Sequence, residues 1–289
     1  MRKPTVFLLA LSVPAAGIAA SPSLVQNEYV FARDVAAHGI RDGFLMHLDK
    51  QSITFAPKPV NAYDFYTRSK PNSTKLQWYP AYAVVSSDGS FGVDTGPWTA
   101  DWTQDGKPRT AAGEWLTVWE RDSSGAWLAQ FDGGASHGAS DTPEKALAEE
   151  TPATLLPVPA GPPLGVDQGR TEVVQRDKAF SDDAAKSLKT AYENAATDDI
   201  RLLLDNTQPL VGREPVLKSL PGASAELQWV AMGGSVAHSG DLAYLYGMTY
   251  KSDDADHATP LGVYVHVWRR ETGGWKLLIS EEQPLPQPK

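Results

Sequence analysis

The chain repeats itself at a nearly constant offset, and this repeat constrains its fold more than any local motif. Residues 76–78 (LQW) recur at 227–229, which is 151 residues later. Residues 113–119 (GEWLTVW) recur as 262–268 (GVYVHVW), 149 residues later, and in each copy a glycine-containing turn and a second tryptophan follow. Two further elements match in the same order, so we infer that one folding unit was duplicated.

The repeat divides the chain into two domains. We assign residues 21–138 to domain 1 and 171–284 to domain 2, and both lengths suit a single domain. Residues 139–170 are rich in proline, which prevents regular structure, and we interpret them as an interdomain linker with one helical turn near 144–149. Residues 285–289 are expected to form a frayed tail.

Residues 1–20 have the pattern of a signal peptide. Arg2 and Lys3 precede the apolar residues 6–13 (VFLLALSV), and the small residues 15–20 then offer a cleavage site. A membrane anchor is the alternative, but the apolar stretch is shorter than the about 20 residues that span a bilayer. The pattern predicts an exported protein, periplasmic or secreted.

Charge and cysteine content exclude several classes of partner. The chain has 35 acidic and 26 basic residues, a formal net charge of -9, which disfavours nucleic acid and anionic membrane surfaces. It has no cysteine, so disulfides and thiolate metal sites are excluded. No segment beyond the signal peptide is long and apolar enough to span a membrane. We expect neither a metal nor a cofactor, since no ordered set of ligands and no phosphate-binding motif is present.

Each copy begins with helical spacing and continues as hairpins. Apolar residues recur at helical spacing over 24–36, and a second short helix follows over 40–48. Copy two repeats this over 173–180 and 184–195. The remainder is broken by Gly and Asp turns, which predicts an α+β fold of two tandem domains, each a strongly curved antiparallel sheet with helices packed on one face. Pro97, inside a predicted strand, indicates an edge or a bulge.

Several of these strands resemble a known family. Residues 94–98 (DTGPW), 113–119 and, in copy two, 243–247 (AYLYG) and 264–275 are similar to the SnoaL-like branch of the nuclear transport factor 2-like superfamily. The resemblance implies cone-shaped domains, in which helices close one side of a bent sheet around a pocket. The superfamily includes isomerases, dehydratases, cyclases and hydrolases as well as binding and accessory domains. No complete catalytic set of these enzymes matches this sequence, so no catalytic residue is carried over.

Three residues are candidates for acid–base chemistry. His47 ends the second helix and has a reference pKa suited to proton transfer, although a helix-end cation is the plainer interpretation. Asp94 lies opposite Phe91 and Val93 in its strand, and since those two look core-like, the alternation favours an outward Asp94 over one in the pocket. His266 lies on a strand of copy two.

Aromatic residues are candidates for a ligand site. Trp98 and Trp115 have no tryptophan counterpart in copy two, whereas three other tryptophans recur and are expected to pack in the cores. The strongest candidate for a ligand site lies on adjacent predicted strands of copy two and consists of Tyr244, Tyr246, Tyr264 and His266. The alternative is that these side chains only pack in a core.

Three hypotheses about function remain open. The favoured one is an exported protein that binds a small apolar or aromatic molecule in a cone pocket, or an accessory domain, without strong catalysis. The alternative is an acid–base enzyme that uses His47, Asp94 or His266. The third is a structural pair, a pseudo-dimer of domains or a homodimer, in which side chains fill both cones.

Overall fold

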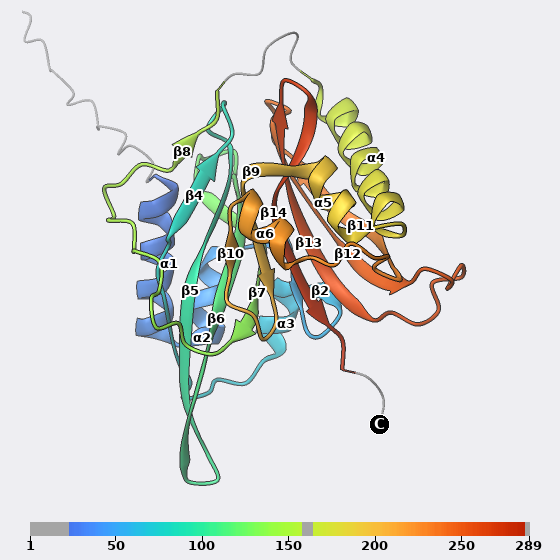
Figure 1. Cartoon of the computed structure of the whole chain (residues 1–289). Helices are drawn as coiled ribbons and strands as arrows, with labels where there is room; N and C mark the ends of the chain where they lie inside the picture. The colour runs from blue at the N-terminus through green and yellow to red at the C-terminus, as the bar shows by residue number, and fades with distance from the viewer. Residues whose placement is uncertain (1–22, 158–163, 287–289) are drawn as a thin grey trace, which may run out of the picture.

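The structure, a computed structural model, describes residues 23–157 and 164–286. Two β-sheets pack against each other, and helices cover the outer face of each sheet (Figure 1). The predicted α+β class with two domains is confirmed. The predicted signal peptide, residues 1–20, lies outside the described residues.

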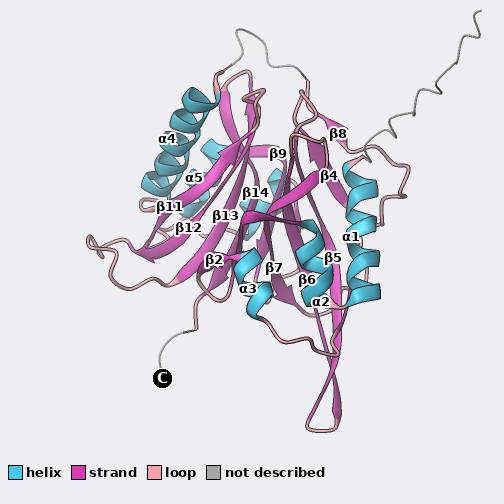
Figure 2. Ribbon diagram, turned by 180° about the vertical axis from the view of Figure 1, so that it is seen from behind, coloured by secondary structure: helices cyan, strands magenta, loops and turns pink. Residues whose placement is uncertain are grey.

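Domain 1 is an eight-stranded sheet with three helices on one face (Figures 1 and 2). The strand order is β2-β1-β7-β6-β5-β4-β8, and β3 also pairs with β5. Most pairs are antiparallel, but β1 pairs with β7 and β4 pairs with β8 in parallel. The elements are α1 (Leu24–His38), α2 (Ile40–His47), β1 (Leu48–Phe55), β2 (Pro59–Asn61), α3 (Ala62–Arg68), β3 (Lys75–Trp78), β4 (Tyr82–Val85), β5 (Phe91–Gln104), β6 (Lys107–Arg121), β7 (Trp127–His137) and β8 (Thr154–Leu155).

Domain 2 repeats this arrangement with six strands. Their order is β10-β9-β14-β13-β12-β11, in which β9 and β14 form the parallel pair. The parallel pair occupies the same place as β1 and β7 in domain 1, which agrees with a duplicated unit. The elements are α4 (Val166–Ala184), α5 (Leu188–Ala195), β9 (Ala196–Leu204), β10 (Leu210–Val211), α6 (Arg213–Ser219), β11 (Leu227–Val236), β12 (Leu242–Lys251), β13 (Gly262–Glu271) and β14 (Gly274–Pro284).

Local sequence signals set the start and end of the first helix. The Ser23 hydroxyl accepts a hydrogen bond from the Gln26 backbone N–H at 3.2 Å, and the Gln26 side chain accepts one from the Ser23 N–H at 2.9 Å. This reciprocal capping satisfies two N–H groups that the helix itself cannot pair. Gly39 follows the helix with φ of 83°, a conformation that glycine adopts at little cost.

The molecule has three hydrophobic cores in a row. One lies between the helices and sheet of domain 1, and another in the same place in domain 2. The third lies between the two sheets and takes residues from both domains, among them Phe91, Phe131, Tyr244, Val265 and Ile279. Central strands are therefore buried on both faces, because one face meets helices and the other meets the second sheet.

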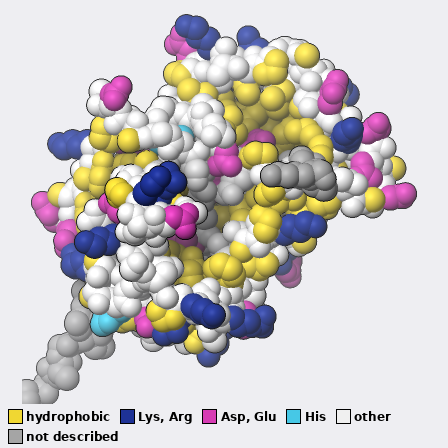
Figure 3. Space-filling view, turned by 90° about the horizontal axis from the view of Figure 1, so that it is seen from below, with side chains coloured by type: hydrophobic (Ala, Val, Ile, Leu, Met, Phe, Trp, Pro, Cys, Tyr) yellow, Lys and Arg dark blue, Asp and Glu magenta, His cyan; other side chains and the backbone are white. Residues whose placement is uncertain are grey.

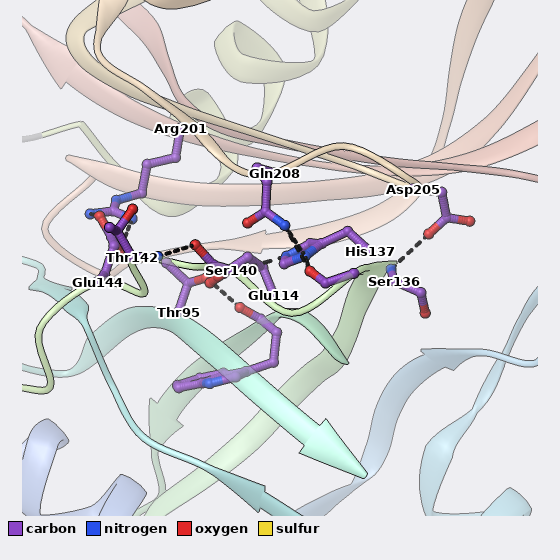
Figure 4. Close-up of polar contacts among 12 residues, drawn as sticks. Thr95, Glu114, Ser136, His137, Ser140, Thr142, Glu144, Arg201, Asp205 and Gln208 are labelled. Carbon is purple, nitrogen blue, oxygen red and sulfur yellow. Dashed lines mark hydrogen bonds and ion pairs between the residues drawn. The ribbon is translucent and has the colours of Figure 1, made fainter. Parts of the chain in front are cut away.

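Polar contacts also join the domains (Figure 4). The Asp205 carboxylate accepts a hydrogen bond from the Ser136 N–H at 2.8 Å, and the Arg201 guanidinium donates to both oxygens of Glu144 at 2.7 and 3.1 Å. Arg201 belongs to domain 2, while Glu144 lies in residues 139–157, which pack on domain 1. Such paired, two-point hydrogen bonds fix orientation. The two sheets are thus held in one relative position by apolar and polar contacts.

The predicted linker is largely part of domain 1. Within residues 139–157, β8 pairs with β4, and the Leu156 N–H donates to Val85 at 2.8 Å. The expected helical turn at 144–149 does not form there, because residues 143–148 have no regular structure and the Leu147 N–H bonds to the Pro80 carbonyl. A turn closes only at residues 148–151, where the Thr151 N–H bonds to the Ala148 carbonyl. The expected fraying from residue 285 is also wrong for Leu285, which is buried and bonds to Leu261.

Pro97 lies where β5 changes partner. Residues 92–95 pair with β4, and residues 98–101 pair with β3. Proline lacks an N–H, so it is tolerated at this interruption, in agreement with the predicted edge or bulge. Beyond it the β5–β6 hairpin projects as a long arm that turns at Asp105 and Gly106, which have φ of 51° and 71° (Figure 1).

Candidate functional site

The cone of domain 1 contains a cavity of about 230 Å³. Its walls come from helices α2 and α3 and from five strands, so residues far apart in sequence meet there. Aromatic side chains dominate the lining, and Asp132 is its one carboxyl. The lining residues are Phe44, Thr54, Tyr66, Leu76, Trp78, Trp98, Trp115, Asp132, Gly133 and Gly134.

Gly134 on β7 puts no side chain into this cavity, whereas a Cβ at Gly133 would point to Phe131 and Glu281 on the interdomain face. Gly134 pairs with Trp115 across the sheet, and in domain 2 the pair at the same place is Glu282 with Tyr264. Glu282 fills the corresponding volume, where it accepts a hydrogen bond from the Tyr192 hydroxyl at 3.1 Å. The same position is therefore a glycine beside the cavity in domain 1 and a glutamate that occupies the corresponding space in domain 2.

Asp132 is a partly buried carboxyl on the wall of the cavity. The Thr117 hydroxyl, its cross-strand partner, donates a hydrogen bond to it at 2.8 Å. Burial raises the pKa of Asp132 to about 7, because the apolar walls disfavour the charged form, and the Thr117 hydrogen bond offsets only part of this. Both protonation states of Asp132 are therefore accessible near neutral pH.

A second acidic group lies behind the wall. Glu28 and Asp94 are fully buried and close enough to repel each other when both are charged, which favours the neutral form of these carboxyls. The Trp119 N–H donates to both, at 3.2 Å to Glu28 and 2.9 Å to Asp94, and the Trp78 N–H donates to Glu28. Burial raises the pKa of Glu28 to about 8, and burial together with the neighbouring Glu28 raises that of Asp94. The expectation that Asp94 faces outward is wrong, because both faces of its strand are covered.

His47 does not line the cavity. Its Nε2 lies 2.7 Å from a carboxylate oxygen of Asp34, and its ring packs against Phe31 at a centroid distance of 4.9 Å. The side chain is almost buried between the first two helices. This placement supports a role in helix packing more than one in chemistry.

His266 forms a buried dyad in the cone of domain 2. Its Nδ1 lies 2.6 Å from Asp177 Oδ1, while the Tyr264 hydroxyl donates to Asp177 Oδ2 at 2.8 Å and the Trp268 N–H to Oδ1 at 3.2 Å. The ring is fully buried and packs edge-on against Phe180. Asp177 thus gathers three donors inside a packed core.

The predicted tyrosine cluster is divided between two faces of the sheet. Tyr264 and His266 face the cone of domain 2, whereas Tyr244 and Tyr246 face the other sheet and pack in the interdomain core. Tyr244 lies 6.4 Å from Phe91 of domain 1, between ring centroids. These four residues therefore do not form one ligand site.

The tryptophans separate largely, but not wholly, as the repeat predicts. Trp98 and Trp115, which have no counterpart in copy two, line the cavity. Of the recurring ones, Trp119 and Trp268 are fully buried in cores, whereas Trp78 is half-buried and also lines the cavity, which the expectation of a shared core missed. The Trp115 N–H is buried and lacks a hydrogen-bond partner.

The residue patterns of the sequence did not single out Glu28, Asp132 or Asp177. A signal for two of them was present, since a carboxylate interrupts the apolar face of the first helix at the same place in both copies: Leu24, Glu28, Phe31, Val35 and Val173, Asp177, Phe180, Ala184. Charged residues are almost never fully buried without a partner, so a repeated one on a core face indicates a built polar site. Asp132 gave no comparable signal.

A second polar cluster lies between the domains (Figure 4). Glu114 and His137 approach to 3.8 Å with side chains that are almost fully buried. Burial, with the nearby Glu144, raises the pKa of Glu114 to about 8. This cluster faces the other sheet and is separate from the cavity.

Metal and membrane criteria give no further site within the described ranges. Among residues 23–157 and 164–286, no group of three or more His, Asp or Glu is arranged to hold a metal ion. None of the helices in these ranges is both long and apolar enough to cross a bilayer.

Comparison with known proteins shows similarity in structure only. No protein-family profile matches the sequence, and no curated protein sequence matches it. Among solved structures, an NTF2-like protein with a cystatin-like fold from Novosphingobium aromaticivorans is 15% identical, with 42% of this chain and 84% of that chain covered and a TM-score of 0.32. A candidate dehydratase from the NTF2-like family of Streptomyces avermitilis is 18% identical, with 42% and 99% covered and a TM-score of 0.34. The CaMKII hub of S. rosetta is 21% identical, with 41% and 99% covered and a TM-score of 0.32.

The family that the sequence resembles thus recurs among these structures, and each match spans a share of the chain that corresponds to one domain. At this identity and TM-score the likeness carries no argument about activity or ligand. The site must be judged from its own geometry.

Proposed function

We propose that domain 1 binds a small organic molecule with an aromatic or apolar body in its cone cavity. The observation that carries this is the aromatic cavity itself, which combines apolar walls with a few polar groups, as ligand sites do. Its volume suits one ring with a short side chain. Domain 2 then serves as a packed partner, since Glu282 and Tyr192 occupy the corresponding space.

The geometry supports binding over a purely structural pair. A structural pair needs side chains that fill both cones, and domain 1 does not meet this condition.

A cavity-filling substitution with a matched control tests the proposal. Leu76 lines the cavity, and the repeat places Leu227 at the same position in domain 2. Compounds that stabilise the wild type are selected by thermal shift from phenols, indoles and arylalkylamines. Leu76→Trp is expected to weaken their binding more than tenfold, and Leu227→Trp to leave it unchanged. Equal binding to wild type and Leu76→Trp would contradict the proposal.

Acid–base catalysis in the same cavity is the second candidate function. The observation that favours it is Asp132, whose pKa of about 7 suits a group that both gives and takes a proton. Asp132→Asn should then abolish turnover of any compound that the cavity converts while its binding persists. His47 and His266 are weaker candidates, since both are packed into cores.

We also propose that the chain is exported. The support is the sequence pattern of residues 1–20, with its basic start, apolar stretch and small residues. Expression of the full chain in a Gram-negative host, followed by N-terminal sequencing of the periplasmic fraction, tests this. A mature N-terminus near residue 20 or 21 is expected, whereas full-length protein confined to the cytoplasm would contradict it.

A further inference from the structure

The charge of the cavity limits which molecules it can hold. Its lining contains one carboxyl, that of Asp132, and no Lys, Arg or His. Glu28 and Asp94 lie behind the wall, linked to it through Trp78, whose N–H donates to Glu28. The ionisable groups of the lining and of the Glu28–Asp94 cluster are therefore acidic, whereas His47 lies behind Phe31 and pairs with Asp34. An anionic ligand would meet repulsion without a cationic partner, while a cation would relieve it.

The aromatic walls favour the same class of ligand. Because the Trp78 N–H is directed at Glu28, its carbon surface is what remains for the cavity. Trp98 and Phe44 complete the lining with Trp115 and Tyr66, and Tyr66 stacks on Phe44 at 4.5 Å between ring centroids. Aromatic rings beside a carboxylate recognise organic ammonium groups, since each ring presents negative electron density to a cation.

We propose that the ligand of domain 1 is an organic ammonium ion, held by the Asp132 carboxylate and the aromatic walls. This inference rests on the proposed function, because it specifies the molecule that the cavity binds. Arylalkylamines and choline-like quaternary ions have this chemistry.

Binding of such a cation is linked to a proton on Asp132. Asp132 interacts electrostatically with Glu28 on α1, Asp94 on β5, Tyr66 on α3 and Glu281 on β14, and none of them is cationic. His47 on α2 is paired with Asp34 instead. The empty site therefore keeps Asp132 protonated below about pH 7. A bound cation favours the carboxylate, so affinity for it should rise with pH through this range, while affinity for a neutral molecule should not.

Isosteric ligand pairs test the inference on the intact chain. The pairs are tyramine with tyrosol, and choline with 3,3-dimethylbutan-1-ol, in which the cation is replaced by a neutral group and an oxygen is kept. Calorimetric titration at pH 6 and pH 8 should show the charged member of at least one pair binding about tenfold more tightly at pH 8, with a smaller advantage at pH 6. Asp132→Asn should remove most of the advantage. Glu114→Gln changes a buried carboxyl on the opposite face of the same sheet and should retain it.

The possible outcomes separate the inference from the proposed function. If the neutral members bind as tightly as the cations or more tightly, the ammonium inference is overturned while a small-molecule site remains. If no compound of either pair binds, and the wider thermal-shift panel also fails, both are overturned. If Asp132→Asn fails to fold, the pH dependence of the wild type alone decides the inference.

Discussion

Glu28 and Asp177 are 149 residues apart and make the same contact between helix and sheet in the two domains. Each is a buried carboxyl group on the first long helix of its domain, and each accepts a hydrogen bond at 3.2 Å from a fully buried tryptophan N–H. The tryptophans, Trp119 and Trp268, are a recurring pair of the sequence repeat. The contact that joins helix to sheet was thus kept in both copies, while the groups around it diverged.

Substitution of the two carboxyls should have unequal effects. Asp177→Asn places an amide N–H among three donors, so we expect a loss of about 3–5 kcal/mol in the free energy of unfolding. Glu28→Gln should cost about 1 kcal/mol or less at pH 7, because burial raises the pKa of Glu28 to about 8 and the neutral form is already favoured. Urea denaturation at pH 7 measures both, and equal losses would contradict this account.

Stability should fall as pH rises from about 5 to 8. Burial raises the folded-state pKa of Asp132 to about 7 and those of Glu28, Glu114 and Glu281 to about 8. Between the unfolded-state and folded-state pKa values of these groups, the folded chain binds more protons than the unfolded chain. The free energy of unfolding is therefore highest below the unfolded-state values and decreases as the pH rises to the folded-state values. Asp132→Asn should flatten this decline by about 2 kcal/mol, discounted for its partial exposure. Urea midpoints that rise between pH 5 and pH 8 would overturn the assignment.

Burial on both faces of a strand explains where prediction from sequence succeeded and failed. The repeat predicted the two-domain fold and the buried pairs Trp119/Trp268 and Trp127/Trp275, but not that Trp78 would line a cavity. Alternation misplaced Asp94, because Phe91 and Val93 pack in the interdomain core while the opposite face lies in the cone. The alternation of side chains along a strand does not show whether a given face is covered by helices or by a second sheet. The cavity depends on Gly134 meeting Trp115 across the sheet, and that register is set by tertiary pairing.

The shared core should make the two domains unfold together. Phe131 of domain 1 packs against Tyr244 of domain 2 at 6.3 Å between ring centroids. Phe131→Ala should cost about 3–5 kcal/mol and leave a single transition. Hydrogen exchange that follows peptides of each domain through a urea series measures this. Separate midpoints for the two domains in the wild type would show that the interface does not couple them.

Gly113 should be irreplaceable for the shape of the cavity. A methyl group there would lie 2.0 Å from the Ala135 carbonyl oxygen and 2.7 Å from the Trp98 indole nitrogen. Gly113→Ala should therefore destabilise the chain by about 2–3 kcal/mol and displace Trp98. Gly138→Ala, where no atom lies within 4 Å, is the control and should change stability by about 0.5 kcal/mol or less. Near-equal melting temperatures for the two variants would contradict the strand packing.

The distinction between an open cone and a filled one is tested most directly by fluorine NMR of protein labelled with 5-fluorotryptophan. The chain has nine tryptophans, so nine resonances can be assigned by single Trp→Phe substitutions. On addition of tyramine, or of another compound that the thermal-shift screen selects, the resonances of Trp78, Trp98 and Trp115 should shift together. Those of Trp229, Trp268 and Trp275 in domain 2, and of Trp102 on the projecting arm, should stay in place. Shifts confined to the domain 2 tryptophans or to Trp102 would contradict the account.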